Sequence, residues 1–204
     1  MATSYVALIG DAVASRRLSA RARSRLQDEL GSGLKEVNRR WRRAIAAGFA
    51  VTLGDQFQGL LSEAGPVWDI SHWLRAALPQ VDWVIAAGRG PIHTSLGRTA
   101  PETDGPCFHR AREALDGAKQ RRLILAFGGF GAGLDGLAEY YSALYWGWTP
   151  RQRRAASLLR VTRPADVAER LKIGRSAVSH LARRMGWRLV EAGDVVFQRR
   201  LGSA

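Results

Sequence analysis

Short apolar runs alternate with longer amphipathic segments along the first three quarters of the chain, a pattern typical of a mixed α+β domain. Apolar runs bounded by turn residues predict strands at residues 4–10, 49–53, 57–61, 81–88 and 122–127. Between them, apolar residues recur at spacings of three and four, which predicts helices over about 19–45, 67–77, 107–119 and 134–146. The second and third strands are expected to form a hairpin, because only Gly54-Asp55-Gln56 separates them.

The order strand, helix, strand, strand, helix, strand predicts a ferredoxin-like α+β sandwich. In such a sheet the turn of the hairpin lies beside the end of the first strand. Asp11 follows the first strand, Asp55 lies in the hairpin, and each comes directly after a glycine. The predicted fold therefore brings together two carboxylates that are 44 residues apart in the sequence.

Two carboxylates held side by side repel each other unless a cation lies between them. Mg²⁺ takes oxygen ligands and is commonly held by one or two carboxylates together with substrate phosphates. We therefore interpret Asp11 and Asp55 as candidate ligands of Mg²⁺, or Mn²⁺, bound with a nucleotide. Candidate phosphate contacts follow the first strand, at Ala12, Ser15, Arg16 and Arg17. The alternative is that each Gly-Asp pair only completes a turn.

A helix-turn-helix pattern occupies the end of the chain. Residues 164–184 read as two short helices around a tight turn at Lys172-Ile173-Gly174, with the spacing typical of DNA-binding modules. Thr149-Pro150 is typical of the start of a preceding helix, so we expect two domains, residues 1–147 and 148–204. Residues 187–198 are expected to form a β-hairpin that serves as a wing.

The positive charge is concentrated in the same terminal segment. The chain carries 31 Lys and Arg against 18 Asp and Glu, a net charge of +13. Residues 148–204 hold 13 of these basic residues and 4 of the acidic ones, a net charge of +9. A basic terminal module indicates a polyanionic partner, most often nucleic acid. The alternative is an Arg-rich surface that only keeps the protein in solution.

The remaining composition concerns the compartment. A single cysteine, Cys107, allows no internal disulfide and fits a reducing environment. The N-terminus shows no signal-peptide pattern, and no apolar run approaches the length of a membrane span. We therefore expect a cytoplasmic protein that does not bind membranes.

Three sequence blocks suggest a family. IGDAVASRR, TLGDQFQGLL and DGPCFHRAREALDGAK occur in this order and together resemble the SatD family of small bacterial proteins. The resemblance covers nearly the whole chain, including the helix-turn-helix. It implies no defined biochemical activity.

More distantly, residues 4 to about 127 resemble the class III nucleotidyl cyclases and their diguanylate cyclase relatives. These share a palm-type sheet and two metal-binding aspartates, so the resemblance implies that Asp11 and Asp55 are metal ligands. In cyclases, Asn and Arg four residues apart steady the phosphates, whereas His109 and Glu113 stand at these positions here. The nearby arginines are the candidate phosphate contacts, Arg110 and Arg112. The resemblance thus implies metal and phosphate binding but not cyclisation.

The second helix of the terminal pattern is the candidate DNA-reading helix. Its expected outward-facing residues are Arg175, Ser176, Ser179, His180 and Arg183, which suit base or phosphate contacts. Further phosphate contacts are expected from Arg151, Arg153, Arg154 and Arg184. The alternative is a helical hairpin used for contacts with another protein.

Two functions fit these patterns. The first is a regulator of transcription that binds double-stranded DNA and senses a metal-bound nucleoside triphosphate or related ligand. The second is an active nucleotidyl cyclase or nucleotidyltransferase that the terminal helices localise. The displaced Asn/Arg pair favours the sensor, because phosphoryl transfer depends on positioned charges. A homodimer is expected, since helix-turn-helix proteins often bind paired half-sites.

Overall fold

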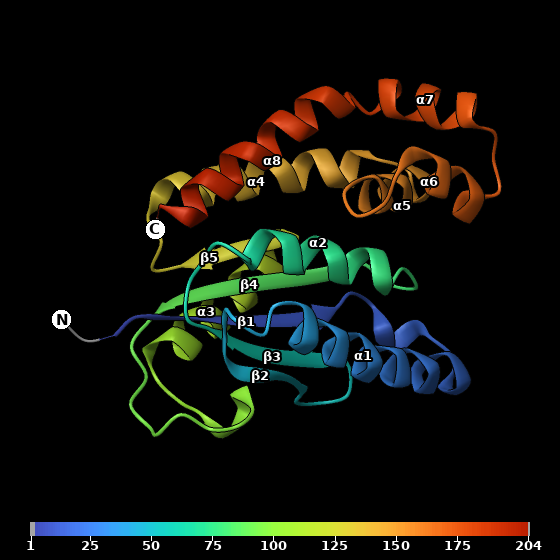
Figure 1. The fold of residues 1–204 in the computed structure, drawn as a ribbon. Helices are drawn as coiled ribbons and strands as arrows, with labels where there is room; N and C mark the ends of the chain where they lie inside the picture. The colour runs from blue at the N-terminus through green and yellow to red at the C-terminus, as the bar shows by residue number, and fades with distance from the viewer. Residues whose placement is uncertain (1–2, 204) are drawn as a thin grey trace.

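The computed structural model describes residues 3–203, which form five strands, eight α-helices and two 3-10 helices (Figure 1). The strands are β1 (Tyr5–Ala12), β2 (Ile45–Val51), β3 (Gln56–Leu61), β4 (Trp83–Gly90) and β5 (Leu125–Gly128). The α-helices are α1 (Ala20–Arg40), α2 (Val67–Ala77), α3 (Pro106–Arg121), α4 (Ala132–Gly147), α5 (Pro150–Leu159), α6 (Pro164–Leu171), α7 (Arg175–Arg184) and α8 (Trp187–Gly202). The 3-10 helices are η1 (Ser15–Arg17) and η2 (Ala100–Glu102). The predicted mixed α+β fold is confirmed, and none of these helices is long and apolar enough to cross a membrane.

The strands form one sheet in the order β2-β3-β1-β4-β5. Central strand β1 is antiparallel to both neighbours, so that Asp11 pairs with Gln56 of β3 on one side and with Val84 of β4 on the other. The first four strands have the order that the strand, helix, strand, strand, helix, strand pattern predicts. β5 then extends the sheet parallel to β4. The end of β1 therefore lies beside the β2–β3 turn.

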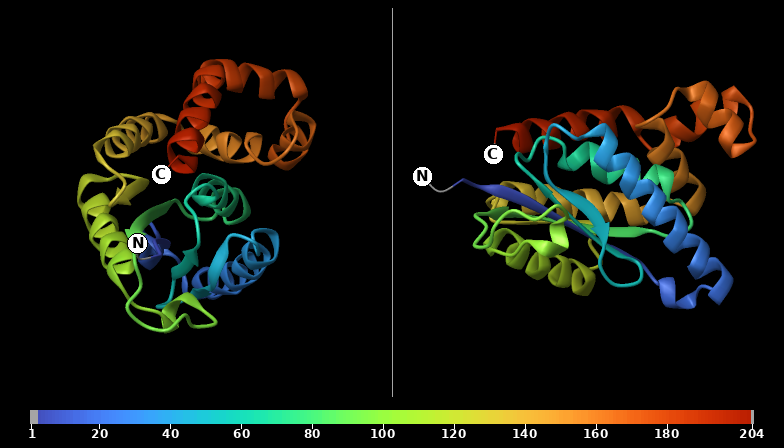
Figure 2. Two further views of the ribbon diagram at one scale, coloured as in Figure 1. Left: turned by 60° about the vertical axis from the view of Figure 1, so that its left-hand side comes forward. Right: turned by 60° about the horizontal axis from the view of Figure 1, so that its bottom comes forward.

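Different helices cover the two faces of the sheet (Figure 2). Alternate β1 residues divide between two cores, because side chains of a strand point in turn to opposite faces. Leu8 belongs to the core formed with α1, α2 and α4, whereas Ile9 belongs to the core formed with α3. α3 lies very close to β4 at Gly88, where an added Cβ would be 2.2 Å from the backbone nitrogen of Ala111. The C-terminal end of α3 thereby returns to the end of β1.

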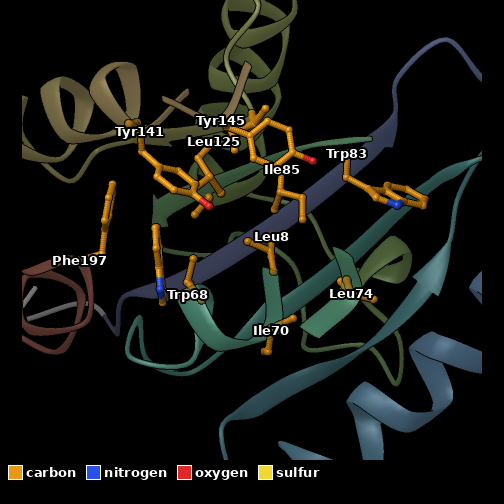
Figure 3. Close-up of a cluster of buried hydrophobic side chains, with 14 of the residues drawn as sticks. Leu8, Trp68, Ile70, Leu74, Trp83, Ile85, Leu125, Tyr141, Tyr145 and Phe197 are labelled. Carbon is orange, nitrogen blue, oxygen red and sulfur yellow. The ribbon is translucent and has the colours of Figure 1, made fainter. Parts of the chain in front are cut away.

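The C-terminal helices pack directly on the first part of the chain. Phe197 of α8 stacks on Trp68 of α2, with ring centroids 4.0 Å apart and an angle of 15° between the planes. Tyr141 of α4 meets the same phenyl ring edge-on at 6.1 Å (Figure 3). The guanidinium of Arg160 lies 5.2 Å from the centroid of the Tyr141 ring and pairs with Asp194 of α8 at 2.7 Å. One apolar core therefore runs from the sheet to α8.

The predicted β-wing is wrong, because residues 187–202 form helix α8. Val190, Phe197 and Leu201 are buried at spacings of seven and four, which places them on one face of a helix. The turn expected at Ala192-Gly193-Asp194 does not form. Asp194 instead stays within the helix, where it pairs with Arg160.

The predicted boundary after residue 147 falls between α4 and α5. Thr149 begins α5 with a capping box, in which its hydroxyl accepts from the backbone N–H of Gln152 and the Gln152 side chain accepts from the backbone N–H of Thr149. Trp148, between the two helices, is buried in the main core. The connection is therefore short and fixed, and α5 cannot move far from the sheet without disturbing that core.

Candidate functional site

A cleft of about 1150 Å³ opens at the end of the sheet where β1 finishes and the β2–β3 turn lies. This is the right-hand end of the sheet in Figure 1. The segment 11–18 and the hairpin residues 53–56 form one side of the cleft. The loop 79–84 and the ends of α3 and α4 continue it, and α5 closes it. The cleft thus joins the sheet domain to the first of the C-terminal helices.

Asp11 and Asp55 both line this cleft, as the hairpin geometry predicts. Asp11 is held by two side chains from other elements. Lys119, near the end of α3, places its Nζ 2.8 Å from Asp11 Oδ2, and Gln56 Nε2 donates to Asp11 Oδ1 at 2.9 Å. Arg112 Nη1 in turn donates to Gln56 Oε1 at 2.8 Å, which fixes the orientation of the amide. Both oxygens of Asp11 are therefore already engaged.

With both of its oxygens engaged, Asp11 lacks the free carboxylate oxygens that a divalent cation needs. Mg²⁺ keeps several of its waters and is held by one or two carboxylates, so it needs carboxylate oxygens that are free to bind it. The ammonium group of Lys119 lies where such a cation would contact Asp11, and Asp55 is the other carboxylate predicted for the site. Within residues 3–203, no three His, Cys, Asp or Glu side chains are grouped so that they could hold a metal. The residues present therefore do not fit Mg²⁺ or Mn²⁺ without displacement of Lys119.

The segment after β1 also lies where the sequence analysis expects it. Ala12, Ser15, Arg16 and Arg17 all line the cleft. The methyl group of Ala12 is buried in the core, so only its backbone faces the opening. Ala14 adopts a left-handed conformation with φ of 56°, which turns the chain into η1. Ser15 is buried there, whereas Arg16 and Arg17 are exposed.

The predicted phosphate contacts on α3 do not line the cleft. Arg110 donates to the backbone carbonyl of Arg89, near the opposite end of β4. Arg112 reaches the site only indirectly, through Gln56. His109 pairs with Asp104 at 3.0 Å and shares a separate shallow depression with Arg112 and Glu113. The positions that correspond to the cyclase Asn and Arg are therefore not part of the cleft.

Two of the predicted DNA contacts lie in the cleft instead. Arg153 Nε is 3.4 Å from Asp82 Oδ1, and its Nη1 donates to the carbonyl of Trp148 at 2.9 Å. Arg154 Nη1 donates to the carbonyl of Ala76 at 2.9 Å, and burial lowers the pKa of this guanidinium, with a smaller contribution from Arg170. Arg153 and Arg154, which the sequence analysis predicts as DNA phosphate contacts, therefore line the cleft. Arg151, on the first turn of α5, is exposed.

Several cleft residues were not predicted from the sequence, namely Arg75, Asp82, Lys119, Arg122 and Tyr145. Tyr145 donates its hydroxyl proton to Asp82 at 2.6 Å, and burial raises the pKa of this tyrosine. A usable signal existed for Lys119. A helix that connects β4 to a parallel neighbour must return to the start of β4, and the start of β4 lies beside the end of β1. The last turn of that helix is therefore directed to Asp11.

The outer face of α7 is separate from the cleft. Val178 anchors the helix in a small core with Leu158, Val167 and Ala168. Lys172 closes the turn between α6 and α7 in a left-handed conformation, with φ of 53°. The five residues predicted to face outward on α7 are all exposed, namely Arg175, Ser176, Ser179, His180 and Arg183, and so is Arg184, which was predicted as a phosphate contact.

The fold and the cleft define a mixed α+β protein with a cation-lined site at one end of its sheet. Residues 5–123 match the model of the SatD family, and the chain belongs to this family. The match includes Asp11, Asp55 and Lys119 and ends before α4. No curated protein matches the chain. The structure of a bacterial light-regulated adenylyl cyclase is similar over 62% of this chain and 76% of that chain, with a TM-score of 0.40 and 14% identity. A likeness at this level says nothing about activity.

Proposed function

We propose that this SatD-family protein binds duplex DNA through α7 and binds a phosphorylated, nucleotide-type ligand in the cleft, as a regulator of transcription. The observation that carries the DNA part is the exposed face of α7. Arg175, Ser179 and Arg183 follow one another at spacings of four, as do Ser176, His180 and Arg184. Two such neighbouring rows form one continuous face of a helix.

The composition of this face suits DNA. Arginine pairs with guanine edges and with phosphates, and serine contacts either phosphate or base. α6 and α7 lie at the periphery of the molecule (Figure 2), where a duplex can reach them without contact to the sheet. The buried side of α7 is held by Val178, so the face keeps its orientation. A homodimer on two half-sites remains a prediction from the motif.

The test of DNA binding is the anisotropy of a short labelled duplex, titrated with the full chain at increasing salt. Removing two phosphate contacts lowers the salt slope by about two, and loss of a bidentate base contact costs about 1–3 kcal/mol. The double variant Arg175→Ala/Arg183→Ala is therefore expected to bind at least tenfold more weakly. The control Arg21→Ala/Arg25→Ala removes the same charge from exposed positions on α1. Equal effects of the two double variants would contradict the assignment of α7.

The cleft supports ligand binding rather than cyclisation. Seven of its lining residues are Arg or Lys and three are Asp, so it favours an anion. The positions expected to stabilise phosphoryl transfer, His109 and Glu113, lie outside it. Incubation with each nucleoside triphosphate and Mg²⁺ or Mn²⁺, followed by assay of pyrophosphate, separates the two functions. If pyrophosphate is released and Asp55→Ala abolishes its release, the protein is a nucleotidyl cyclase or nucleotidyltransferase and not only a sensor.

A further inference from the structure

The charges of the cleft are unevenly paired. Lys119 neutralises Asp11, and Arg153 pairs with Asp82. After these two pairs, Asp55 is the one remaining carboxylate among the described residues of the cleft. Five arginines of the cleft form no ion pair within residues 3–203, namely Arg16, Arg17, Arg75, Arg122 and Arg154. A surface with this excess attracts a multiply charged anion and retains it better than it retains a cation.

The buried positive charge of Arg75 destabilises the protein when no ligand is bound. Its side chain is 4% exposed, and its two Nη atoms each donate at 2.6 Å to backbone carbonyls, of Trp83 and of Ile124. Its Nε has no hydrogen-bond partner among the described residues, and no carboxylate pairs with it there. A buried charge without a counter-charge is strongly unfavourable. An anion bound in the cleft would relieve this cost.

The unpaired arginines lie on both sides of the cleft. Arg16 and Arg17 belong to η1 at the end of β1, whereas Arg154 belongs to α5, the first of the C-terminal helices. Arg122, directly after α3, also lines the cleft. A chain of phosphates carries oxygens along its length, so one such chain can accept hydrogen bonds from both sides at once. A single monophosphate has fewer oxygens to share among arginines that come from separate elements.

From these observations, and resting on the proposed nucleotide-type ligand, we infer that the cleft binds a polyphosphate chain directly through arginines on both sides, without a divalent ion. Lys119 takes the role that a metal would have beside Asp11. The bound phosphates bridge η1 and α5, and thereby connect the sheet domain to the helices that carry α7.

The experiment is calorimetric titration of the full chain with ATP and with inorganic triphosphate, each in EDTA and in Mg²⁺. Both probes are expected to bind in EDTA at least as tightly as in Mg²⁺, because Mg²⁺ neutralises part of the phosphate charge that the arginines recognise. Binding of ATP in Mg²⁺ alone, lost in Asp11→Asn, would overturn the inference and leave the proposed nucleotide site intact. No binding of either probe in either buffer would overturn both.

Variants test the two sides and the role of Lys119. Arg16→Ala and Arg154→Ala, one from each side, are each expected to weaken triphosphate binding about tenfold or more, since charge-assisted hydrogen bonds contribute about 1.5–3 kcal/mol. The control Arg21→Ala is expected to leave binding unchanged. Lys119→Met exposes the charge of Asp11, so its binding is expected to become weaker in EDTA and to be restored by Mg²⁺. Unchanged triphosphate affinity in Arg154→Ala would overturn the bridge between η1 and α5. Triphosphate binding by Lys119→Met that Mg²⁺ does not restore would overturn the role of Lys119.

Discussion

At the scale of single residues, His72 is a buried histidine whose protonation the fold opposes. Its side chain lies on α2 between the rings of Trp68 and Tyr141, and neither ring nitrogen has a hydrogen-bond partner among the described residues. Burial lowers the pKa of His72 well below its ordinary value, and the charges of Arg160 and Arg75 lower it further. The folded protein therefore keeps this imidazole neutral.

This arrangement predicts a loss of stability in mild acid. The unfolded chain takes up a proton on His72 near its ordinary pKa of about 6.5, whereas the folded chain does not. The contribution of neutral His72 is thus complete above that pH and falls by about 1.4 kcal/mol per pH unit below it, until the folded chain is protonated too. Urea denaturation at several pH values measures the slope. His72→Phe is expected to remove the pH dependence of the free energy of unfolding that His72 causes. His93→Gln, at an exposed position, is expected to keep it. Identical slopes in wild type and His72→Phe would refute the assignment.

Lys172, in the turn between α6 and α7, has a strained backbone conformation. Its φ of 53° is a left-handed conformation, which costs a residue with a Cβ atom more than glycine. Lys172→Gly is therefore expected to raise the free energy of unfolding by up to about 1 kcal/mol. Lys172→Ala removes the same charge and keeps the Cβ, so it separates the backbone effect from electrostatics. An equal gain in both variants, measured by urea denaturation, would contradict the backbone explanation.

At the scale of elements, the approach of α3 to β4 depends on Gly88. A Cβ at this position would lie 2.2 Å from both the backbone nitrogen of Ala111 and the carbonyl oxygen of Cys107, and a helix backbone cannot yield locally. Gly88→Ala is expected to destabilise the protein by about 1–3 kcal/mol or more. Because α3 also carries Lys119, its displacement should weaken the pairing with Asp11. Thermal unfolding followed by circular dichroism measures the effect.

The matched control lies on the same helix. Gly117 has no atom within 4 Å of the position of an added Cβ, so Gly117→Ala is expected to stabilise α3 by about 0.5–1 kcal/mol through helix propensity. Opposite signs for the two Gly→Ala changes identify close packing as the cause. A stabilising Gly88→Ala would show that α3 and β4 are not in contact at this point.

The elements differ in how well the sequence predicts them. β1, β3 and α2 could be predicted, because β1 and β3 are short apolar runs ended by turn residues and α2 carries apolar residues at helical spacing. α8 could not, because Gly193-Asp194 is typical of a turn and the apolar residues of 187–198 fit either period. What decides the conformation is the packing of Phe197 on Trp68, more than a hundred residues earlier in the chain. Local patterns carry no information on such a contact.

The candidate site shows the same limit. The positions of Asp11 and Asp55 could be predicted because strand order alone brings them together. The return of α3 to the start of β4 indicates that its last turn lies near Asp11. Which side chain of that turn meets Asp11 could not be predicted, since it depends on how far α3 extends and on which of its faces meets the sheet. Likewise, Arg153 and Arg154 belong to a basic run that is typical of a DNA-binding surface, and only the docking of α5 shows that they turn into the cleft.

At the scale of the whole molecule, the shared core predicts that the sheet and the C-terminal helices unfold together. Phe197, Trp68 and Tyr141 form one aromatic group across α8, α2 and α4 (Figure 3). We expect one transition, seen alike by far-ultraviolet circular dichroism and by tryptophan fluorescence. Phe197→Ala removes the central ring and should cost about 3–5 kcal/mol, which lowers the midpoint of thermal unfolding by roughly 10 °C for a chain of this size.

A control on the same helix makes this result specific. Val196 is adjacent to Phe197 but 42% exposed, so Val196→Ala is expected to change the midpoint little. If the C-terminal helices instead unfolded first, Phe197→Ala would produce an early second transition while the sheet kept its own midpoint. Such independence would also remove the mechanical path by which a ligand between η1 and α5 influences α7. A single transition, by contrast, means that a ligand which stabilises the cleft also stabilises the orientation of the DNA-facing helix.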